Sequence, residues 1–278
     1  MTAISLMPVR PIPSSGVPVP IVGLGTWQSF DVGADAAARA VRTRVLQRFA
    51  SLGGAVIDSS PMYGSAESVV GDLLGAVTGV WQPFVATKVW TQGRAAGIRQ
   101  METSMARLRT PIIDLMQVHN LVDVDTHLAT LTDWKTEGRV RHIGVTHYNE
   151  SAYAAVTQVI ERHTIDTLQI NYSVAERSAE CRLLPLARER GIAVIINRPF
   201  AEGDALRRLR NRILPNWAHD IGCTSWPQLL LKFVLSHPAV TCTIPGMSSI
   251  PHVEDCLAAA TGPMPDAALR ARIAEAAG

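Results

Sequence analysis

Four polar side chains capable of proton transfer stand at the ends of consecutive apolar runs that are typical of buried strands. Asp58 closes the first of these runs, and Tyr63 follows five residues later, in a turn beside Gly64. Lys88 and His119 close the next two runs. If the runs are neighbouring strands of one sheet, then a carboxylate, a phenol, an amine and an imidazole meet at the same edge of that sheet.

Such a set of groups can protonate a carbonyl oxygen. The phenol of Tyr63 has an ordinary pKa of about 10, which a nearby ammonium group lowers because it favours the phenolate. Asp58, bonded to Lys88, keeps that amine charged and fixed, while His119 can orient a substrate oxygen toward the phenol. A hydride must also reach the carbonyl carbon. Because no side chain donates hydride, a nicotinamide cofactor is indicated.

Each of the four residues also has an ordinary structural interpretation. An aspartate before Ser59-Ser60 can cap a turn, and a lysine at a strand end can extend into solvent. A single histidine, or a tyrosine beside glycine, is often a packing residue. Lys88 on a barrel strand could instead form a Schiff base, but that mechanism needs a lowered pKa, whereas Asp58 would keep the amine charged. The coincidence at successive strand ends favours the proton-transfer hypothesis.

The rest of the chain alternates short apolar runs with longer amphipathic segments, which predicts a parallel sheet covered by helices. The expected strands are Ile21–Leu24, Ala55–Asp58, Phe84–Lys88, Ile113–His119, Val140–Val145, Thr167–Asn171, Ala193–Asn197 and Val240–Ile244. The expected helices are Ala34–Leu52, Ala66–Leu74, Ile98–Leu108, Thr126–Thr136, Ala152–His163, Ala179–Arg190, Ser225–Ser236, His252–Ala260 and Asp266–Ala277. Eight strand–helix units without a break in composition favour a single α/β domain, residues 1–278, folded as a (β/α)₈ TIM barrel.

The alternative fold is an open, doubly wound sheet that binds a dinucleotide. That fold predicts a G-x-G-x-x-G motif after the first strand, and this chain supplies only Gly23 and Gly25 there. The Pro-rich stretch from Pro8 to Pro20 predicts a short hairpin that closes the floor of the barrel, and Asp266–Ala277 predicts a C-terminal helix.

Composition excludes several classes of protein. Of the 278 residues, 47% are apolar, which is enough for a large core, and the net charge of +2 comes without a basic stripe, so neither nucleic acid nor a membrane surface is an expected partner. The densest basic run, Arg207 to Arg210, is typical of a solvated helix face. Four cysteines far apart, without a C-x-x-C pair, indicate neither disulfides nor a metal site. We expect a soluble, cytoplasmic monomer with no apolar run long enough to span a membrane.

The motifs that contain these residues resemble the aldo-keto reductase superfamily over nearly the whole chain. "VIDSSPMYGSAE" is similar to the strand-and-loop signature of that family, and "ATKVW" and "DLMQVHN" follow in order. The resemblance implies that Tyr63 is the general acid, that Asp58 and Lys88 tune it, and that His119 orients the substrate carbonyl.

The same resemblance implies where a cofactor and a substrate bind. "VGLGTW" is similar to the first strand end of the family, Gln169 matches the glutamine that holds the nicotinamide carboxamide, and "CTIPGMSS" resembles the loop that receives the adenosine 2′-phosphate. The full set implied for the cofactor is Gly25, Thr26, Trp27, Thr146, His147, Gln169, Arg198, Phe200, Gly246, Ser248, Ser249, His252 and Asp255. The substrate pocket is expected to be lined by Trp27, Phe30, Trp90 and Tyr148.

Some residues depart from the pattern of the family. Thr146-His147 replaces the common Ser-Asn, and Asn197 stands where many members place an aromatic ring under the nicotinamide. The tail after the last strand is short, which predicts an open pocket and broad specificity. No Lys or Arg occurs between Lys232 and Arg270, so the presumed phosphate loop lacks a basic side chain of its own.

Together these features predict an enzyme that reduces aldehydes and ketones. Its substrate would be a small carbonyl compound, and its cofactor NADP(H), with NAD(H) as a weaker substitute. The alternative is a cofactor-binding regulatory or redox-sensor subunit with slow turnover, a class that the intact set of Asp58, Tyr63, Lys88 and His119 disfavours.

Overall fold

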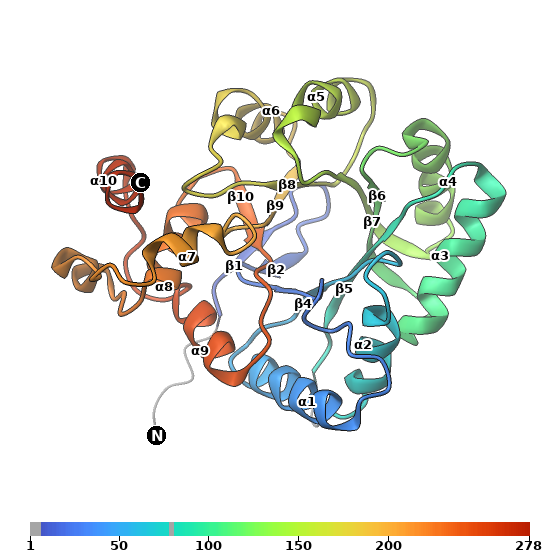
Figure 1. The fold of residues 1–278 in the computed structure, drawn as a ribbon. Helices are drawn as coiled ribbons and strands as arrows, with labels where there is room; N and C mark the ends of the chain where they lie inside the picture. The colour runs from blue at the N-terminus through green and yellow to red at the C-terminus, as the bar shows by residue number, and fades with distance from the viewer. Residues whose placement is uncertain (1–6, 78–80) are drawn as a thin grey trace.

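A ring of eight parallel strands forms the centre of the computed structural model, which describes residues 7–77 and 81–278 (Figure 1). The strands lie in chain order, each hydrogen-bonded to the next. They are β3 (Leu24–Gly25), β4 (Val56–Asp58), β5 (Phe84–Val89), β6 (Ile113–His119), β7 (Val140–Thr146), β8 (Thr167–Asn171), β9 (Ala193–Asn197) and β10 (Val240–Thr243). Isolated parallel bridges, Val22↔Thr243 and Gly25↔Gly246, close the ring between β3 and β10. The predicted (β/α)₈ barrel is confirmed.

Helices surround the ring on its outer face (Figure 1). They are α1 (Ala36–Ser51), α2 (Ala66–Leu74), α3 (Arg94–Leu108), α4 (Val124–Thr136), α5 (Tyr153–Arg162), α6 (Leu183–Glu189), α7 (Asp204–Leu209), α8 (Trp226–Leu235), α9 (Ile250–Ala258) and α10 (Ala267–Ala277). Short 3₁₀ turns are η1 (Glu150–Ala152), η2 (Ser178–Cys181) and η3 (Asn216–Ile221). No helix among residues 7–77 and 81–278 combines the length and apolar character needed to cross a membrane.

The strands form where apolar residues are buried on both faces of the sheet. In β6, every residue before His119 is buried, which is the pattern of a strand between a barrel interior and a layer of helices. Each helix turns a narrower apolar face inward. In α5 this face consists of Val156, Val159 and Ile160, whose spacing places them on one side of the helix.

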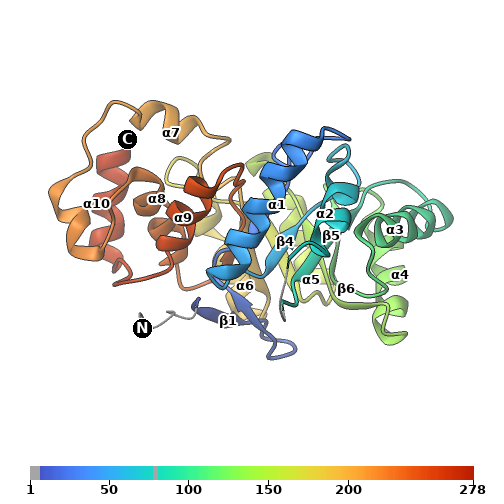
Figure 2. The same ribbon diagram turned by 90° about the horizontal axis from the view of Figure 1, so that it is seen from below.

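The N-terminal hairpin closes one end of the barrel, as predicted. Its strands β1 (Val9–Pro11) and β2 (Pro18–Pro20) pair antiparallel, and Ile12 and Val19 pack into the barrel interior against Val56. Figure 2 shows this hairpin at one end of the barrel and α7 toward the other. Since the hairpin covers the amino ends of the strands, access to the interior is from their carboxyl ends.

Most of the predicted elements are confirmed with ends displaced by a few residues, but two regions differ. The expected helix Ala179–Arg190 is interrupted, and only η2 and α6 form. Pro185 explains the break, because its ring would clash with the carbonyl of Cys181 in a continuous helix. Neither α7 nor η3 was expected, since both are single short turns without a clear apolar period.

Candidate active site

The four proton-transfer residues of the sequence analysis lie together at the carboxyl ends of β4, β5 and β6. Lys88 Nζ donates a hydrogen bond to Asp58 Oδ2 at 2.6 Å and lies 4.9 Å from the centroid of the Tyr63 ring. The Tyr63 and His119 rings meet edge to face with centroids 6.2 Å apart. Asp58, Tyr63 and His119 line one cavity, and Lys88 is fully buried behind them.

Lys88 is held as a buried ammonium group. Besides Asp58, its Nζ donates to the Ser59 carbonyl oxygen at 2.7 Å. Burial alone would lower the pKa of Lys88, but the negative charge of Asp58 and the neighbouring Tyr63 more than offset it, and the pKa is raised. The amine therefore stays protonated at neutral pH, which is unfavourable for a nucleophile that must form a Schiff base.

Two glutamine amides hold the other oxygen of Asp58. Gln169 Nε2 donates to Asp58 Oδ1 at 2.8 Å, and Gln117 Nε2 donates to the same atom at 3.2 Å. Gln169 Oε1 in turn accepts from Thr146 Oγ1 at 3.0 Å. Sequence reasoning missed Gln117, although a polar residue inside the apolar run of β6 was a usable signal. These bonds fix the carboxylate against Lys88.

Tyr63 is in its protonated form at neutral pH. Burial raises the pKa of its phenol, Lys88 opposes this increase, and the charge of Asp58 adds to it. The expected effect of Lys88 is therefore present in sign, but burial outweighs it. A protonated phenol next to a fixed cation is suited to donate a proton, because the phenolate that remains is stabilised.

His119 is neutral over the whole physiological range. Burial, together with the charges of Lys88 and His147, lowers its pKa to about 3. Its Nδ1 lies 3.3 Å from Ser60 Oγ, and that oxygen accepts from the Met62 amide, so the hydroxyl hydrogen is free to point at Nδ1. When the hydroxyl donates to Nδ1, the single ring hydrogen lies on Nε2. A neutral imidazole in that tautomer is a hydrogen-bond donor for a carbonyl oxygen.

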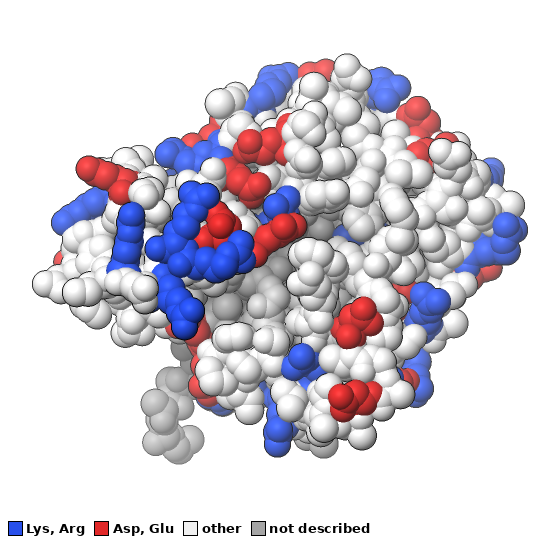
Figure 3. Space-filling model, in the orientation of Figure 1, with Lys and Arg blue, Asp and Glu red and all other residues white. Residues whose placement is uncertain are grey.

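The cavity has a volume of about 620 Å³, within the range of small-molecule sites. Large apolar side chains stand partly exposed at its mouth, namely Trp27, Met62, Trp90 and Tyr148. Figure 3 shows the hollow with the charged side chains of α7 gathered on one side of it. The expectation for Phe30 was wrong, because Phe30 is completely buried in the core between ring and helices. Its amide bonds to the Thr26 carbonyl, and this turn directs the ring inward.

The residues implied for the cofactor separate into two groups. One group lines the cavity and consists of Gly25, Thr26, Trp27, Thr146, Gln169, Arg198, Phe200 and Gly246. The other group does not line it and consists of His147, Ser248, Ser249, His252 and Asp255. His147 stacks on Tyr148 with ring centroids 5.5 Å apart.

The start of α9 contains most of the second group. Ser249 is the N-cap, and its hydroxyl accepts from the His252 amide at 3.4 Å. Ser248 Oγ lies 3.2 Å from His252 Nδ1. Asp255 Oδ1 accepts from Ser225 Oγ and Gln228 Nε2, both at 2.7 Å, and so joins α9 to α8, and its role toward a cofactor stays a prediction.

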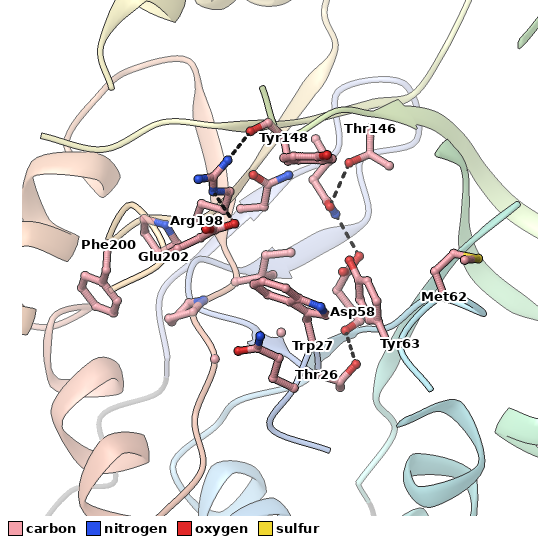
Figure 4. A pocket seen from close by; sticks show the side chains of 18 of the residues that line it. Thr26, Trp27, Asp58, Met62, Tyr63, Thr146, Tyr148, Arg198, Phe200 and Glu202 are labelled. Atoms are coloured by element: carbon pink, nitrogen blue, oxygen red, sulfur yellow. Dashed lines mark hydrogen bonds and ion pairs between the residues drawn. The ribbon is translucent and has the colours of Figure 1, made fainter. Parts of the chain in front are cut away.

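The loop after β9 forms the wall opposite the catalytic residues. Arg198, Ala201 and Glu202 all have positive φ, an uncommon conformation for residues other than glycine. Arg198 Nη1 donates to the Tyr148 carbonyl at 2.7 Å and its Nε lies 3.3 Å from Glu202 Oε1. Figure 4 shows Arg198 between Tyr148 and Glu202, across the cavity from Asp58 and Tyr63. These bonds hold the loop in its strained form.

Two backbone features fit an elongated, anionic cofactor. Gly246 has no atom nearer than 3.9 Å to the position of an added Cβ, so a ligand can approach its backbone. The amides of Ser248, Ser249 and Ile250 donate no hydrogen bond within residues 7–77 and 81–278. Free amides at a helix N-terminus are favourable partners for a phosphate group.

A buried Lys–Asp pair behind a tyrosine at the carboxyl end of a parallel barrel is suited to proton transfer, and comparison with known proteins shows the family of the chain. Residues 21–273 match the model of the aldo/keto reductase family, and the chain belongs to that family. It is 31% identical over 250 residues to methylglyoxal reductase YeaE of Escherichia coli K12, a match that covers 87% of this chain and 85% of the relative.

Two solved structures of Klebsiella pneumoniae aldo/keto reductases share the fold. The first, in complex with NADP and acetate, is 28% identical, has a TM-score of 0.80 and is matched over 96% of this chain and 94% of its own. The second, in complex with NADPH, is 29% identical, has a TM-score of 0.76 and is matched over 93% of this chain and 91% of its own.

Proposed function

We propose that this protein is an NADP(H)-dependent oxidoreductase that reduces aldehydes and ketones to alcohols, with Tyr63 as the proton donor. The observation that carries this proposal is the buried Lys88–Asp58 pair behind Tyr63 on the wall of the cavity. A fixed cation next to a phenol stabilises the phenolate that forms as the proton leaves.

In the proposed reaction, the carbonyl oxygen accepts a hydrogen bond from His119 Nε2 and the proton of Tyr63. Lys88 stabilises the resulting phenolate, and Asp58, held by Gln117 and Gln169, keeps Lys88 charged. When bound, the nicotinamide cofactor supplies the hydride for the carbonyl carbon. In the reverse direction, the phenolate takes the proton from an alcohol.

Residues on two sides of the cavity are suited to hold the cofactor. Gln169 still has a second N–H and a second lone pair for a carboxamide after its bonds to Asp58 and Thr146. The open backbone at Gly246 and the free amides before α9 are suited to phosphate groups. Both known structures described above contain NADP or NADPH, which supports the same cofactor here.

The cavity mouth favours substrates with an apolar or aromatic group. Trp27, Trp90 and Tyr148 are between 38% and 47% exposed, so a bound ring would cover apolar surface already facing solvent. The similarity to a methylglyoxal reductase adds small dicarbonyl compounds to the proposed substrates. A cytoplasmic monomer remains our prediction from the sequence.

The initial rate of NADPH oxidation tests the proposal. We expect wild-type protein to reduce benzaldehyde and methylglyoxal, and to reduce benzaldehyde with the lower KM. A protein that binds NADPH but turns over neither compound would favour the regulatory or redox-sensor alternative. If borohydride trapped a carbonyl adduct on Lys88, the Schiff-base mechanism would replace this one.

A further inference from the structure

Arg42 on α1 joins two loops that lie at opposite ends of the chain. Its Nε donates to the carbonyl oxygen of Ser29, in the loop after β3, and its Nη1 donates to the carbonyl oxygen of Ser248 at 2.6 Å, in the loop before α9. Helices α1 and α9 lie side by side in both views (Figures 1 and 2). One guanidinium group therefore connects the loop after β3 to the loop after β10, the two strands between which the ring closes.

The contact with Ser248 fixes the direction of an unused amide. In a trans peptide the carbonyl and the following N–H point in opposite directions. Because the Ser248 carbonyl points at Arg42, the Ser249 N–H points away from α1. That amide belongs to the Ser248, Ser249 and Ile250 group, which has no hydrogen-bond acceptor in the part of the chain that the structure describes.

Arg42 differs in charge balance from Arg39 and Arg48, two other arginines of α1. Arg39 Nη1 pairs with Asp72 at 2.8 Å, and Arg48 pairs with Glu254 at 2.8 Å. Within residues 7–77 and 81–278, Arg42 has no carboxylate at ion-pair distance and contacts carbonyl oxygens instead. Its positive charge is thus not neutralised, and it lies next to a loop whose own sequence contains no Lys or Arg.

We propose that Arg42 is a positioning residue that aims the amides before α9 at an anionic group and supplies the positive charge that this loop lacks. Resting on the proposed function, the anion is the 2′-phosphate that distinguishes NADP(H) from NAD(H). Arg42 acts through the Ser248 peptide and not by direct contact with the reacting atoms. Its loss is expected to weaken recognition of the 2′-phosphate and to leave the rest of the nucleotide unaffected.

Calorimetric titration with two probes tests this role without any turnover. Adenosine 2′,5′-bisphosphate carries the 2′-phosphate, and 5′-AMP lacks it. We expect Arg42→Met to weaken binding of the bisphosphate about 10-fold or more, in line with the loss of a charge-assisted interaction, and to change the Kd of 5′-AMP by less than about 2-fold. Arg48→Met is the matched control, because it removes the same charge from the same helix and is expected to change neither Kd.

Three results would overturn the inference. These are an unchanged Kd for the bisphosphate in Arg42→Met, equal weakening of both probes, and a wild-type protein that binds both probes equally. If Arg42→Met melts well below Arg48→Met, Arg42→Lys decides the question, since one ammonium group cannot reach both carbonyls as a planar fork does. The Arg42→Lys variant should bind the bisphosphate more weakly than the wild-type protein does, and it should bind 5′-AMP as well as the wild-type protein does. Carbonyl reduction by the wild-type protein is measured in parallel. If Arg42→Met weakens bisphosphate binding selectively but the wild-type protein reduces no carbonyl compound, only the proposed function is contradicted.

Discussion

At the scale of single residues, burial and the charge of Lys88 act in opposite directions on the pKa of the Tyr63 phenol. Tyr63 must hold its proton until a carbonyl oxygen arrives, and it must then give that proton up. Burial secures the first requirement by raising the pKa of the phenol, and the ammonium group of Lys88 serves the second by opposing that rise. Since Lys88 is completely buried, its charge is not screened by solvent.

Replacing Tyr63 with phenylalanine removes the proton donor and little else. We expect Tyr63→Phe to lower kcat for aldehyde reduction by at least about 10²-fold, the usual contribution of general acid catalysis. The Kd for NADPH, measured by quenching of tryptophan fluorescence, should stay close to the wild-type value. A variant that kept more than roughly a tenth of the wild-type kcat, with chemistry rate-limiting, would exclude Tyr63 as the acid.

Replacing Lys88 with methionine should move a pH profile as well as lower a rate. Alcohol oxidation needs the phenolate, so its rate rises with pH through the pKa of Tyr63. Lys88 lowers that pKa, and without the ammonium group the rising limb should shift to higher pH by about one unit or more. If the limb of an active Lys88→Met enzyme stayed in place, the tuning role of Lys88 would be refuted.

The individual residues also show what sequence reasoning can recover. Asp58, Lys88 and His119 were found because strand ends in a barrel converge, and that rule needs only the strand boundaries. Arg42 was missed because it belongs to a helix, and its partner Ser248 is 206 residues away in the chain. Phe30 was wrongly assigned to the substrate pocket because an aromatic residue near a strand end can face either the pocket or the core. No sequence pattern marks the turn that buries it.

Among the elements, α9 is the one whose first turn determines the proposed cofactor preference. His252 is exposed there, and its ring lies beside the Ser248 hydroxyl. We expect the wild-type preference for NADPH over NADH in kcat/KM to be less than about 100-fold, because Arg42 is a single indirect cation. His252→Arg should widen the preference, mainly by lowering the KM for NADPH.

Steady-state rates with both cofactors measure this preference. A wild-type ratio above about 10³ would mean that another cation binds the phosphate directly. The first residues to examine would then be Arg207 and Arg208 of α7, which pair with Asp204 at 3.4 and 2.7 Å.

The bounds of a strand or helix could be predicted from the sequence where a run of buried apolar residues alone defines that element. The strands β6, β8 and β9 have the predicted bounds, because their apolar runs are bounded by polar or turn residues. The helix around Ala179 was mispredicted because its composition is helical, while one proline prevents a continuous helix. Short turns such as α7 owe their shape to tertiary contacts, which no local pattern encodes.

For the whole molecule, two partly buried histidines make stability depend on pH. The pKa of His119 is lowered to about 3 by burial and that of His237 to about 4, also mainly by burial. Below pH 6.5 the unfolded chain binds protons that the folded chain does not, so stability is greatest above that pH and falls as the pH drops toward these values. His119 alone contributes a slope of up to about 1.4 kcal/mol per pH unit.

Urea denaturation of wild type and His119→Gln at pH 7, 6, 5 and 4 measures that slope. The variant should lose less stability than wild type on acidification, because glutamine binds no proton in either state. Parallel curves for the two proteins would show that His119 titrates normally in the folded state.

The closure between β3 and β10 also predicts where the barrel opens most easily. Two isolated bridges join the two sides of this closure, whereas β6 and β7 pair at six positions in one register between Ile113↔Val140 and His119↔Thr146. Arg10 of the hairpin bonds to the Val240 carbonyl and secures the floor, so local opening should begin at the carboxyl end.

Amide hydrogen exchange should therefore be faster at Gly25 and Thr243 than at Val118. NADP⁺ spans both sides of this closure in the proposed site and should slow exchange at Gly25 and Thr243 while leaving Val118 unchanged. Uniform protection across the ring would contradict this expectation. If exchange is fastest at this closure, nucleotide binding completes the barrel, and the protein without nucleotide is a ring that opens and closes at one known position.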